Sequence, residues 1–288
     1  DWGAQFQNGS LVYYEIYQDA EGATTYGFHG GNLSHLSDDK TVVQDGYAVA
    51  YQSTESISSL GATLTVTYPL SEQKTETDEF SYGWNTGDLS IYEVKGVKEV
   101  TDTSGQPKNY YLLPLPDEVV NSDYAAQDFY QEITIQDTKS DIVNTAVSYY
   151  YSPHFANTVV AKNEITSEDE LVDKADQLQV EVRTPRHLYN LSQFEAYYAS
   201  GHQYRFLQQL DLNYMDYTGY ELFQPGWSQN PIGIDANSPF RCSYYGNHHR
   251  ITGVVPAVSY EDEKYQYVGL FGYSTGVLQG VVYEMQET

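Results

Sequence analysis

The stretch YVGLFGYSTG at residues 267–276 decides how the second half of this 288-residue chain is interpreted. It contains three glycines, Gly269, Gly272 and Gly276. Its last five residues match the G-x-S-x-G pattern, which would make Ser274 the nucleophile of a serine hydrolase. The alternative is that the glycines allow the backbone to turn and to pack closely against neighbouring segments. The surrounding sequence distinguishes the two interpretations.

The residues after Ser274 argue against a nucleophile. A nucleophile elbow needs a strand, a sharp turn at the serine and then a helix, with an acid and a histidine later in the chain. Residues 275–285, TGVLQGVVYEM, are rich in glycine and β-branched residues and predict a strand. No aspartate or histidine follows Ser274. We therefore expect no catalytic residue in this stretch.

Other motifs of catalysis and metal binding are also missing from the sequence. The adjacent pair His248–His249 lacks the i, i+4 spacing of an HExxH zinc site, and no glycine-rich phosphate loop occurs. The sequence therefore predicts no catalytic and no metal-ligating residue. Acidic pairs are plentiful, so a carboxylate couple of the glycosidase type stays open as an alternative.

The composition excludes two classes of partner. The chain has 40 Asp and Glu against 14 Lys and Arg, a net charge of −26. Nucleic acids and anionic membrane surfaces are bound through clustered basic residues, so we expect the chain to bind neither. The many carboxylates favour binding of cations, so the sequence allows a structural Ca²⁺ ion. No other cofactor is expected. No run of 18 apolar residues occurs, so no segment is expected to insert into a membrane.

The first part of the chain, residues 1–162, predicts a β-sandwich-like domain. Segments such as LVYYEIY (11–17), TVVQDGYAVAY (41–51) and ATLTVTY (62–68) are rich in Val, Tyr and Thr and are separated by turn residues. Residues 163–182 predict an acidic helical linker. In that linker Ser167 is the expected N-cap, with Glu170 completing a capping box.

The second domain, residues 183–288, begins with a predicted helix and continues in short strands. Thr184 is the expected N-cap of that helix, Pro185 its first residue and Gly201 its end. Strands are expected at 204–212, 239–246, 250–255, 267–273 and 277–285. A chain that coils into stacked strands turns a corner every few residues, where glycine allows positive φ and close backbone approach. The side chains expected to point inward are Val268, Leu270, Phe271, Val277, Leu278 and Val281.

The stretch 267–282, YVGLFGYSTGVLQGVV, resembles the GLUG motif, named for Gly-Leu-hydrophobic-Gly. Here these residues are Gly269, Leu270, Phe271 and Gly272, with Gly276 following. The segments TPRHLYNLSQF, YRFLQQLDLN and NPIGIDANSPFRCSYYGNHHRITGV precede it in the order usual for these bacterial surface modules, over about residues 180–284. The resemblance implies a short right-handed β-helix capped by a helix, or the start of a longer one, in which the motif residues are structural.

The N-terminal part resembles exported, pilin-like proteins of Gram-positive bacteria, through LVYYEIY, VVQDGYAVAY and YYYSPHFANTVV. Together the two resemblances imply a non-enzymatic exported protein at the cell surface, with an adhesive or structural role. Its expected partners are a host or cell-surface glycan or protein, or other surface subunits. Aromatic side chains suit such contacts, so the expected ligand surface comprises Trp84, Tyr220, Phe223 and Trp227. The alternative is a polysaccharide lyase or glycosidase on a β-helix scaffold.

Overall fold

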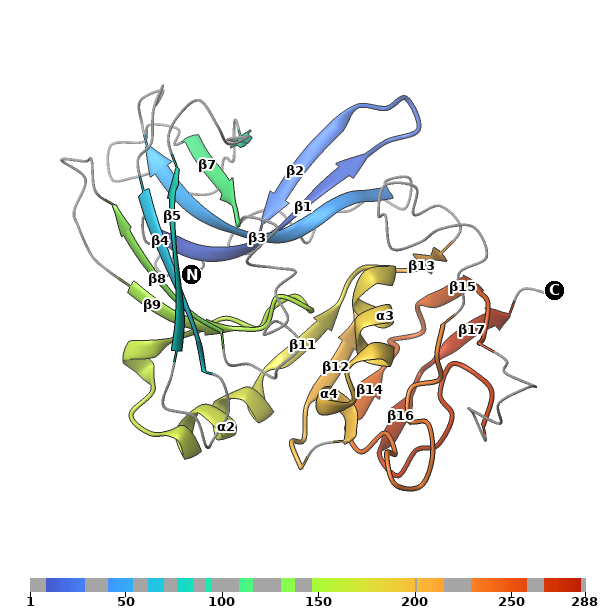
Figure 1. The fold of residues 1–288 in the computed structure, drawn as a ribbon. Coiled ribbons are helices and arrows are strands. Elements are labelled where there is room, and N and C mark those ends of the chain that lie inside the picture. Colours follow the sequence, from blue (N-terminus) through green and yellow to red (C-terminus); the bar gives the residue numbers. More distant parts are fainter. Residues whose placement is uncertain are drawn as a thin grey trace. The chain divides into compact units, whose positions relative to one another are not determined.

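A computed structural model describes residues 9–28, 41–53, 62–69, 77–84, 92–94, 109–115, 131–137, 147–199, 201–214, 229–257 and 267–285. The fold is mainly β, as the sequence predicts (Figure 1). Its contacts divide the chain into two compact units. Unit 1 comprises Asp1–Ala125, Phe129–Pro153 and Val159–Ile165, and unit 2 comprises Ala126–Asp128, His154–Thr158 and Thr166–Thr288.

Unit 1 contains two antiparallel sheets of five strands each. Sheet A has the strand order β2 (Thr24–Phe28), β1 (Ser10–Gln18), β3 (Thr41–Ser53), β7 (Asn109–Pro114) and β6 (Tyr92–Val94). Sheet B has the order β10 (Val160–Ala161), β9 (Val147–Tyr151), β8 (Gln131–Asp137), β4 (Ala62–Pro69) and β5 (Thr77–Trp84). The two sheets touch where the rings of Tyr47 in β3 and Tyr151 in β9 meet edge to face, with centroids 5.3 Å apart.

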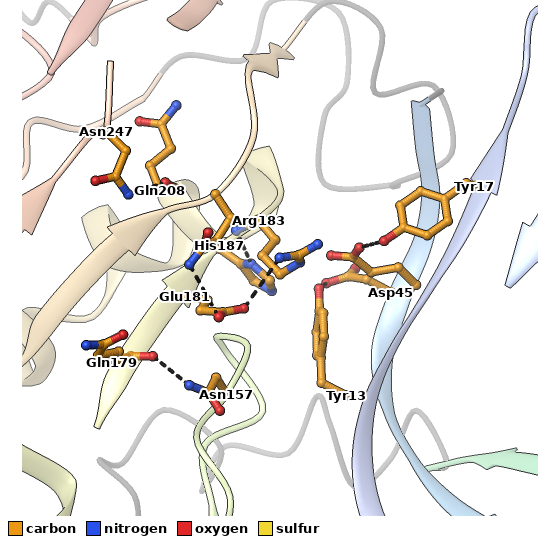
Figure 2. Close-up of polar contacts among 12 residues, drawn as sticks. Tyr13, Tyr17, Asp45, Asn157, Gln179, Glu181, Arg183, His187, Gln208 and Asn247 are labelled. Atoms are coloured by element: carbon orange, nitrogen blue, oxygen red, sulfur yellow. Dashed lines mark hydrogen bonds and ion pairs between the residues drawn. The ribbon is translucent and has the colours of Figure 1, made fainter. Parts of the chain in front are cut away.

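Strand β1 is buried on both of its faces, which explains why its sequence does not alternate between apolar and polar residues. One face contributes to a core cluster that comprises Val12, Tyr14, Ile16, Phe28, Ala48, Ala50 and Leu112. The other face carries Glu15, which is fully buried and accepts a hydrogen bond from the Tyr17 hydroxyl; Figure 2 labels Tyr17. On the same face the Tyr13 hydroxyl donates to Asp45 at 2.7 Å. Hydrogen bonds therefore let a carboxylate lie inside this sheet.

Unit 2 contains two parallel sheets, and successive segments of the chain contribute a strand to each of them. Sheet C has the order β11 (Gln179–Val182), β12 (Arg205–Gln208), β14 (Ser243–Tyr245) and β16 (Val277–Gln279), and sheet D has β13 (Leu212–Asn213), β15 (Arg250–Val254) and β17 (Val282–Met285). Three successive segments, β12–β13, β14–β15 and β16–β17, each add one parallel strand to both sheets (Figure 1). Two isolated parallel bridges, Ile232 with Phe271 and Phe240 with Ser274, join the residues that precede β14 to those that precede β16.

Several of the predicted strands are wrong in detail. The strand predicted over 204–212 is two strands, β12 in sheet C and β13 in sheet D. Residues 267–273 form bends with one isolated bridge at Phe271, and they do not form a strand. The predicted strand over 277–285 is two strands, β16 and β17, because Gly280 between them has a φ of 61°. A residue in this left-handed region turns the chain out of one sheet and into the next.

A row of aromatic rings forms the core of unit 2. Phe155 packs on Phe206, Phe206 on Phe240 and Phe240 on Phe271, with centroid distances of 5.3, 6.4 and 5.2 Å. The ring of Tyr244 meets Phe271 edge to face at 5.4 Å. The successive segments thus pack large aromatic rings against one another, and such rings bury large apolar areas.

The helices of unit 2 begin where the sequence predicts. Ser167 caps α2 (Glu168–Gln177), and its hydroxyl accepts from the Glu170 backbone N–H at 3.2 Å. The capping box is incomplete, because the Glu170 carboxylate accepts instead from the backbone N–H and the hydroxyl of Thr166, at 2.8 and 2.6 Å. These hydrogen bonds from Thr166 lower the pKa of Glu170.

The second predicted helix is two helices. Thr184 caps α3 (Pro185–Gln193) as predicted, but Phe194 is extended and separates it from α4 (Glu195–Ala199). The Ser192 hydroxyl donates to the Tyr189 carbonyl at 2.7 Å, a local bond of the kind that competes with helical hydrogen bonds. The helix breaks there, and the Phe194 ring stacks on His154 with centroids 4.2 Å apart.

Candidate functional site

Ser274 lies between bends that lead into β16, and the residues described after it, 275–285, contain no helix. Its backbone forms the parallel bridge with Phe240, and its hydroxyl donates to the Phe240 carbonyl at 3.4 Å. A nucleophile elbow requires a helix directly after the serine. The geometry around Ser274 is therefore that of a backbone turn between parallel segments.

The glycines of the motif stand where two backbones nearly touch. A Cβ atom on Gly276 would lie 2.0 Å from the Cys242 carbonyl oxygen, and one on Gly272 would lie 2.4 Å from the Gly233 carbonyl oxygen. No side chain fits at either position without moving the backbone. At the same place the Val277 N–H donates to the Cys242 carbonyl at 3.0 Å. The glycines thus allow the last segment to pair closely with the segment before it.

The expectation that six apolar side chains of this stretch point inward holds only in part. Leu270 is buried, and Phe271 packs against Phe240 and Tyr244. In contrast, Val268 is 53 % exposed, Val277 49 % and Leu278 42 %. The expectation is wrong for these three residues. Leu278 is exposed because no strand of the described ranges pairs beyond β16. Val277 is exposed because the register aligns it with Ser243 and the exposed Arg205, on the face that points away from the core.

We call the exposed apolar residues of this last segment the terminal edge. It comprises Val268, Val277, Leu278, Val282 and Tyr283. Among the residues whose side chains are described, only one other large hydrophobic residue, Val43 in unit 1, is comparably exposed. Residues 267–285 also contain a single charged residue, Glu284. An apolar and nearly uncharged surface on a strongly acidic chain is a candidate contact site.

A buried polar network holds the corner between sheets C and D. The side-chain oxygen of Gln208 accepts from the Tyr244 hydroxyl at 3.1 Å, and its amide donates to the Leu210 carbonyl at 3.0 Å. The amide of Asn247 donates to the Gln208 carbonyl at 2.9 Å; Figure 2 shows both residues. Burial raises the pKa of the Tyr244 hydroxyl, which keeps it a hydrogen-bond donor. The network satisfies the polar groups where the chain turns.

His154 and its neighbours form a cluster of buried rings and polar groups. Nδ1 of His154 lies 3.0 Å from the Tyr197 hydroxyl, and the Asn190 amide donates to the His154 carbonyl at 3.0 Å. Burial, with a further contribution from Arg186, lowers the pKa of His154 from 6.5 to about 3. General bases act best with a pKa near the working pH, so this imidazole is suited to packing and not to proton transfer.

His187 is also buried and is held at the junction of β11 and α3. Its Nδ1 accepts from the Arg183 backbone N–H at 3.0 Å, which assigns the ring proton to Nε2. Nε2 lies 3.3 Å from the guanidinium of Arg186. The Arg183 guanidinium lies 3.5 Å from the Glu181 carboxylate, and Figure 2 shows this pair beside His187. His187 thus connects α3 to the end of β11, whereas His154 packs its own turn against α3 and α4.

The ligand surface predicted from the sequence stays a prediction. Trp84 is the last residue of β5, and its side chain lies outside the described part of the chain, as do Tyr220, Phe223 and Trp227. The sequence reasoning missed the terminal edge, whose valines and leucine have the same pattern as buried strands. The only available signal was the scarcity of charge in residues 267–285.

Three further findings bear on the site. In the described ranges, no three His, Cys, Asp or Glu side chains come together in a way that could hold a metal ion. The same part of the chain has no helix whose length and hydropathy would let it cross a membrane. No family model, curated protein or solved structure matches this chain.

Proposed function

We propose that this chain is a non-enzymatic, exported bacterial surface protein with an adhesive or structural role. In this proposal unit 1 is a β-sandwich, and unit 2 is a short right-handed β-helix of the GLUG type. The contact between Tyr47 and Tyr151 supports packed sheets in unit 1. The three segments that each add a parallel strand to sheets C and D support a coiled chain in unit 2.

One observation carries the proposal: the G-x-S-x-G stretch is used to pack backbones. Neighbouring carbonyl oxygens occupy the space beside Gly272 and Gly276, and the Ser274 hydroxyl donates to a backbone carbonyl. The most buried histidines of unit 2 serve packing as well. The residue types that a hydrolase would use are therefore engaged in holding a scaffold together, and a rigid scaffold suits adhesion or assembly.

The proposed ligand is a glycan or a protein at the surface of a cell, held by Trp84, Tyr220, Phe223 and Trp227. Aromatic rings offer an apolar face for a sugar ring and, in tyrosine, a polar tip. A screen of glycans and matrix proteins tests this, with Trp227→Ala as the variant and Trp2→Ala as the matched control. We expect at least one ligand whose affinity falls about tenfold or more in Trp227→Ala only.

Two outcomes would contradict the proposal. The first is an absence of binding to every ligand at about millimolar concentration, the weak limit of specific recognition. The second is release of reducing or unsaturated sugars from a polysaccharide, which would favour the alternative of a lyase or glycosidase. A structural Ca²⁺ ion is tested separately by thermal melts with calcium and with EDTA, since a bound ion raises the melting temperature.

A further inference from the structure

We propose that two copies of this chain associate through the terminal edge, with β16 pairing antiparallel to β16 of the partner around a two-fold axis near Leu278. The proposal goes beyond a scaffold role, because it gives the last segment a specific partner. It depends on three features of that segment: the direction of its backbone groups, the exposure of its inward side chains and its charge.

The backbone of β16 has one paired side and one open side. The Val277 N–H donates to the Cys242 carbonyl at 3.0 Å, and the Gln279 carbonyl accepts from the Gly246 N–H at 2.8 Å. Both residues therefore direct their backbone groups toward the preceding segment. Because alternate residues of a strand point their N–H and C=O groups to opposite sides, those of Leu278 point to the open side. Within the described ranges, no strand pairs with that side.

The inward side chains of β16 and β17 are exposed, whereas the side chains at the same register positions of the preceding strands are buried. In sheet C the register aligns Val180, Phe206 and Tyr244, all buried, with Leu278, which is 42 % exposed. In sheet D it aligns Leu212 and Ile251, both buried, with Tyr283, which is 43 % exposed. The same position is thus buried in every segment except the last, and the open surface continues the interface between segments.

The open side of β16 identifies the partner as a polypeptide. An unpaired strand edge is satisfied by another strand, which a lipid or a sugar cannot supply in the same register. A second copy fits this edge because a two-fold axis makes any edge complementary to itself. Each copy carries a net charge of −26, so repulsion between copies is smallest where charge is scarce. Residues 267–285, with Glu284 as their single charge, meet that condition.

The opposite end of sheet C excludes the other way of joining two copies, in which β16 would extend the first strand of the next molecule. Ala156 already pairs with that strand, through two backbone hydrogen bonds with Glu181 at 3.2 and 3.0 Å. The amide of Asn157 adds a bond to the Gln179 carbonyl at 3.0 Å (Figure 2). With this edge occupied, β16 has no open first strand of sheet C to join in the described part of the chain, and pairing with a second β16 is the arrangement we infer.

Sedimentation equilibrium of the full chain tests the proposal, over about 1 to 200 µM protein. We expect a monomer–dimer equilibrium with a Kd on the order of 10 µM, as for small apolar interfaces. Leu278→Lys should weaken the dimer about tenfold or more, since it places two charges near the axis. The matched control Val43→Lys, at the exposed hydrophobic residue of unit 1, should leave the Kd unchanged. Raising NaCl from about 50 to 500 mM should tighten the dimer by screening.

A second measurement keeps the test valid if Leu278→Lys were to disturb the fold. In the wild-type chain, hydrogen exchange of the Leu278 amide should slow as protein concentration rises, because pairing gives this N–H an acceptor. A monomer at every concentration, an assembly larger than a dimer, or an equal effect of Leu278→Lys and Val43→Lys would each overturn the proposal. So would weakening of the dimer by salt, which would indicate ion pairs in place of an apolar joint.

Discussion

Replacing His154 by glutamine should change how the stability of the protein depends on pH. The imidazole of His154 is buried against Phe194 and Tyr197, and burial lowers its pKa from 6.5 to about 3. The unfolded chain therefore binds a proton on this ring below about pH 6.5, whereas the folded chain stays neutral down to about pH 3. Because the unfolded state binds more protons in this range, the free energy of unfolding falls as the pH falls.

The two pKa values fix the size of this effect. Relative to pH 8, the wild type should lose about 2 kcal/mol at pH 5 and about 3 kcal/mol at pH 4 from His154 alone. Glutamine can still bond to the Tyr197 hydroxyl but does not titrate in this range. The stability advantage of the wild type over His154→Gln should therefore shrink by these amounts, whatever its value at pH 8.

Urea unfolding followed by circular dichroism at pH 8, 5 and 4 measures the difference between the two proteins. The carboxylates are common to both, so their titration cancels. Tyr197→Phe is the control, because it removes the hydrogen-bond partner of His154 but keeps the imidazole buried, and it should retain the pH dependence of the wild type. A difference between wild type and His154→Gln that stays constant within about 0.5 kcal/mol from pH 8 to pH 5 would refute the reasoning. An imidazole signal of His154 that titrates near 6.5 in the folded protein would refute it as well.

Three further predictions concern the scaffold and can be checked by the same urea titrations at pH 8. Gly276→Ala should lower the free energy of unfolding by about 2–3 kcal/mol or more, because the new Cβ would lie 2.0 Å from a backbone oxygen. The control Gly201→Ala, whose Cβ would have nothing within 4 Å, should change it by less than about 1 kcal/mol. Equal effects of the two substitutions would contradict the account of the glycine pattern. Ser167→Ala should lower the free energy of unfolding by about 1 kcal/mol, because it removes the N-cap of α2. An unchanged free energy of unfolding would mean that the hydrogen bond from the Glu170 N–H contributes little. Ser274→Ala should alter stability by less than about 0.5 kcal/mol and should abolish no activity; loss of a hydrolytic activity would restore the nucleophile hypothesis.

Local signals in the sequence predicted the starts of the helices and most of the strands. Thr184 followed by Pro185, and Ser167 before an acidic turn, cap α3 and α2 as predicted. Such signals depend on hydrogen bonds within a few residues, so one sequence is enough to detect them. The break at Phe194 was missed because its ring packs on His154, which lies 40 residues earlier in the chain.

The terminal edge was harder to predict because its exposure depends on the lack of a further paired strand beside β16 in the described part of the chain. Leu278 and Phe206 occupy equivalent positions in the register of sheet C, yet Phe206 is buried and Leu278 is exposed. Hydrophobic patterning reports that a side chain suits a core, but it does not report which strand of a sheet is the outermost. Glu15 shows the same limit, since a strand face that bears a glutamate is buried here through its bond to Tyr17.

The short segment that contains Ala156 has a consequence for how many molecules can join. Parallel sheets that are open at both ends would let copies add one after another, and nothing in such geometry would stop a filament from growing. Because Ala156 pairs with Glu181, sheet C can be extended at β16 alone. Pairing of two molecules there consumes the last open strand of sheet C in both. Five residues, His154–Thr158, thus occupy one end of sheet C, and among the described strands of this sheet they leave β16 as the open edge.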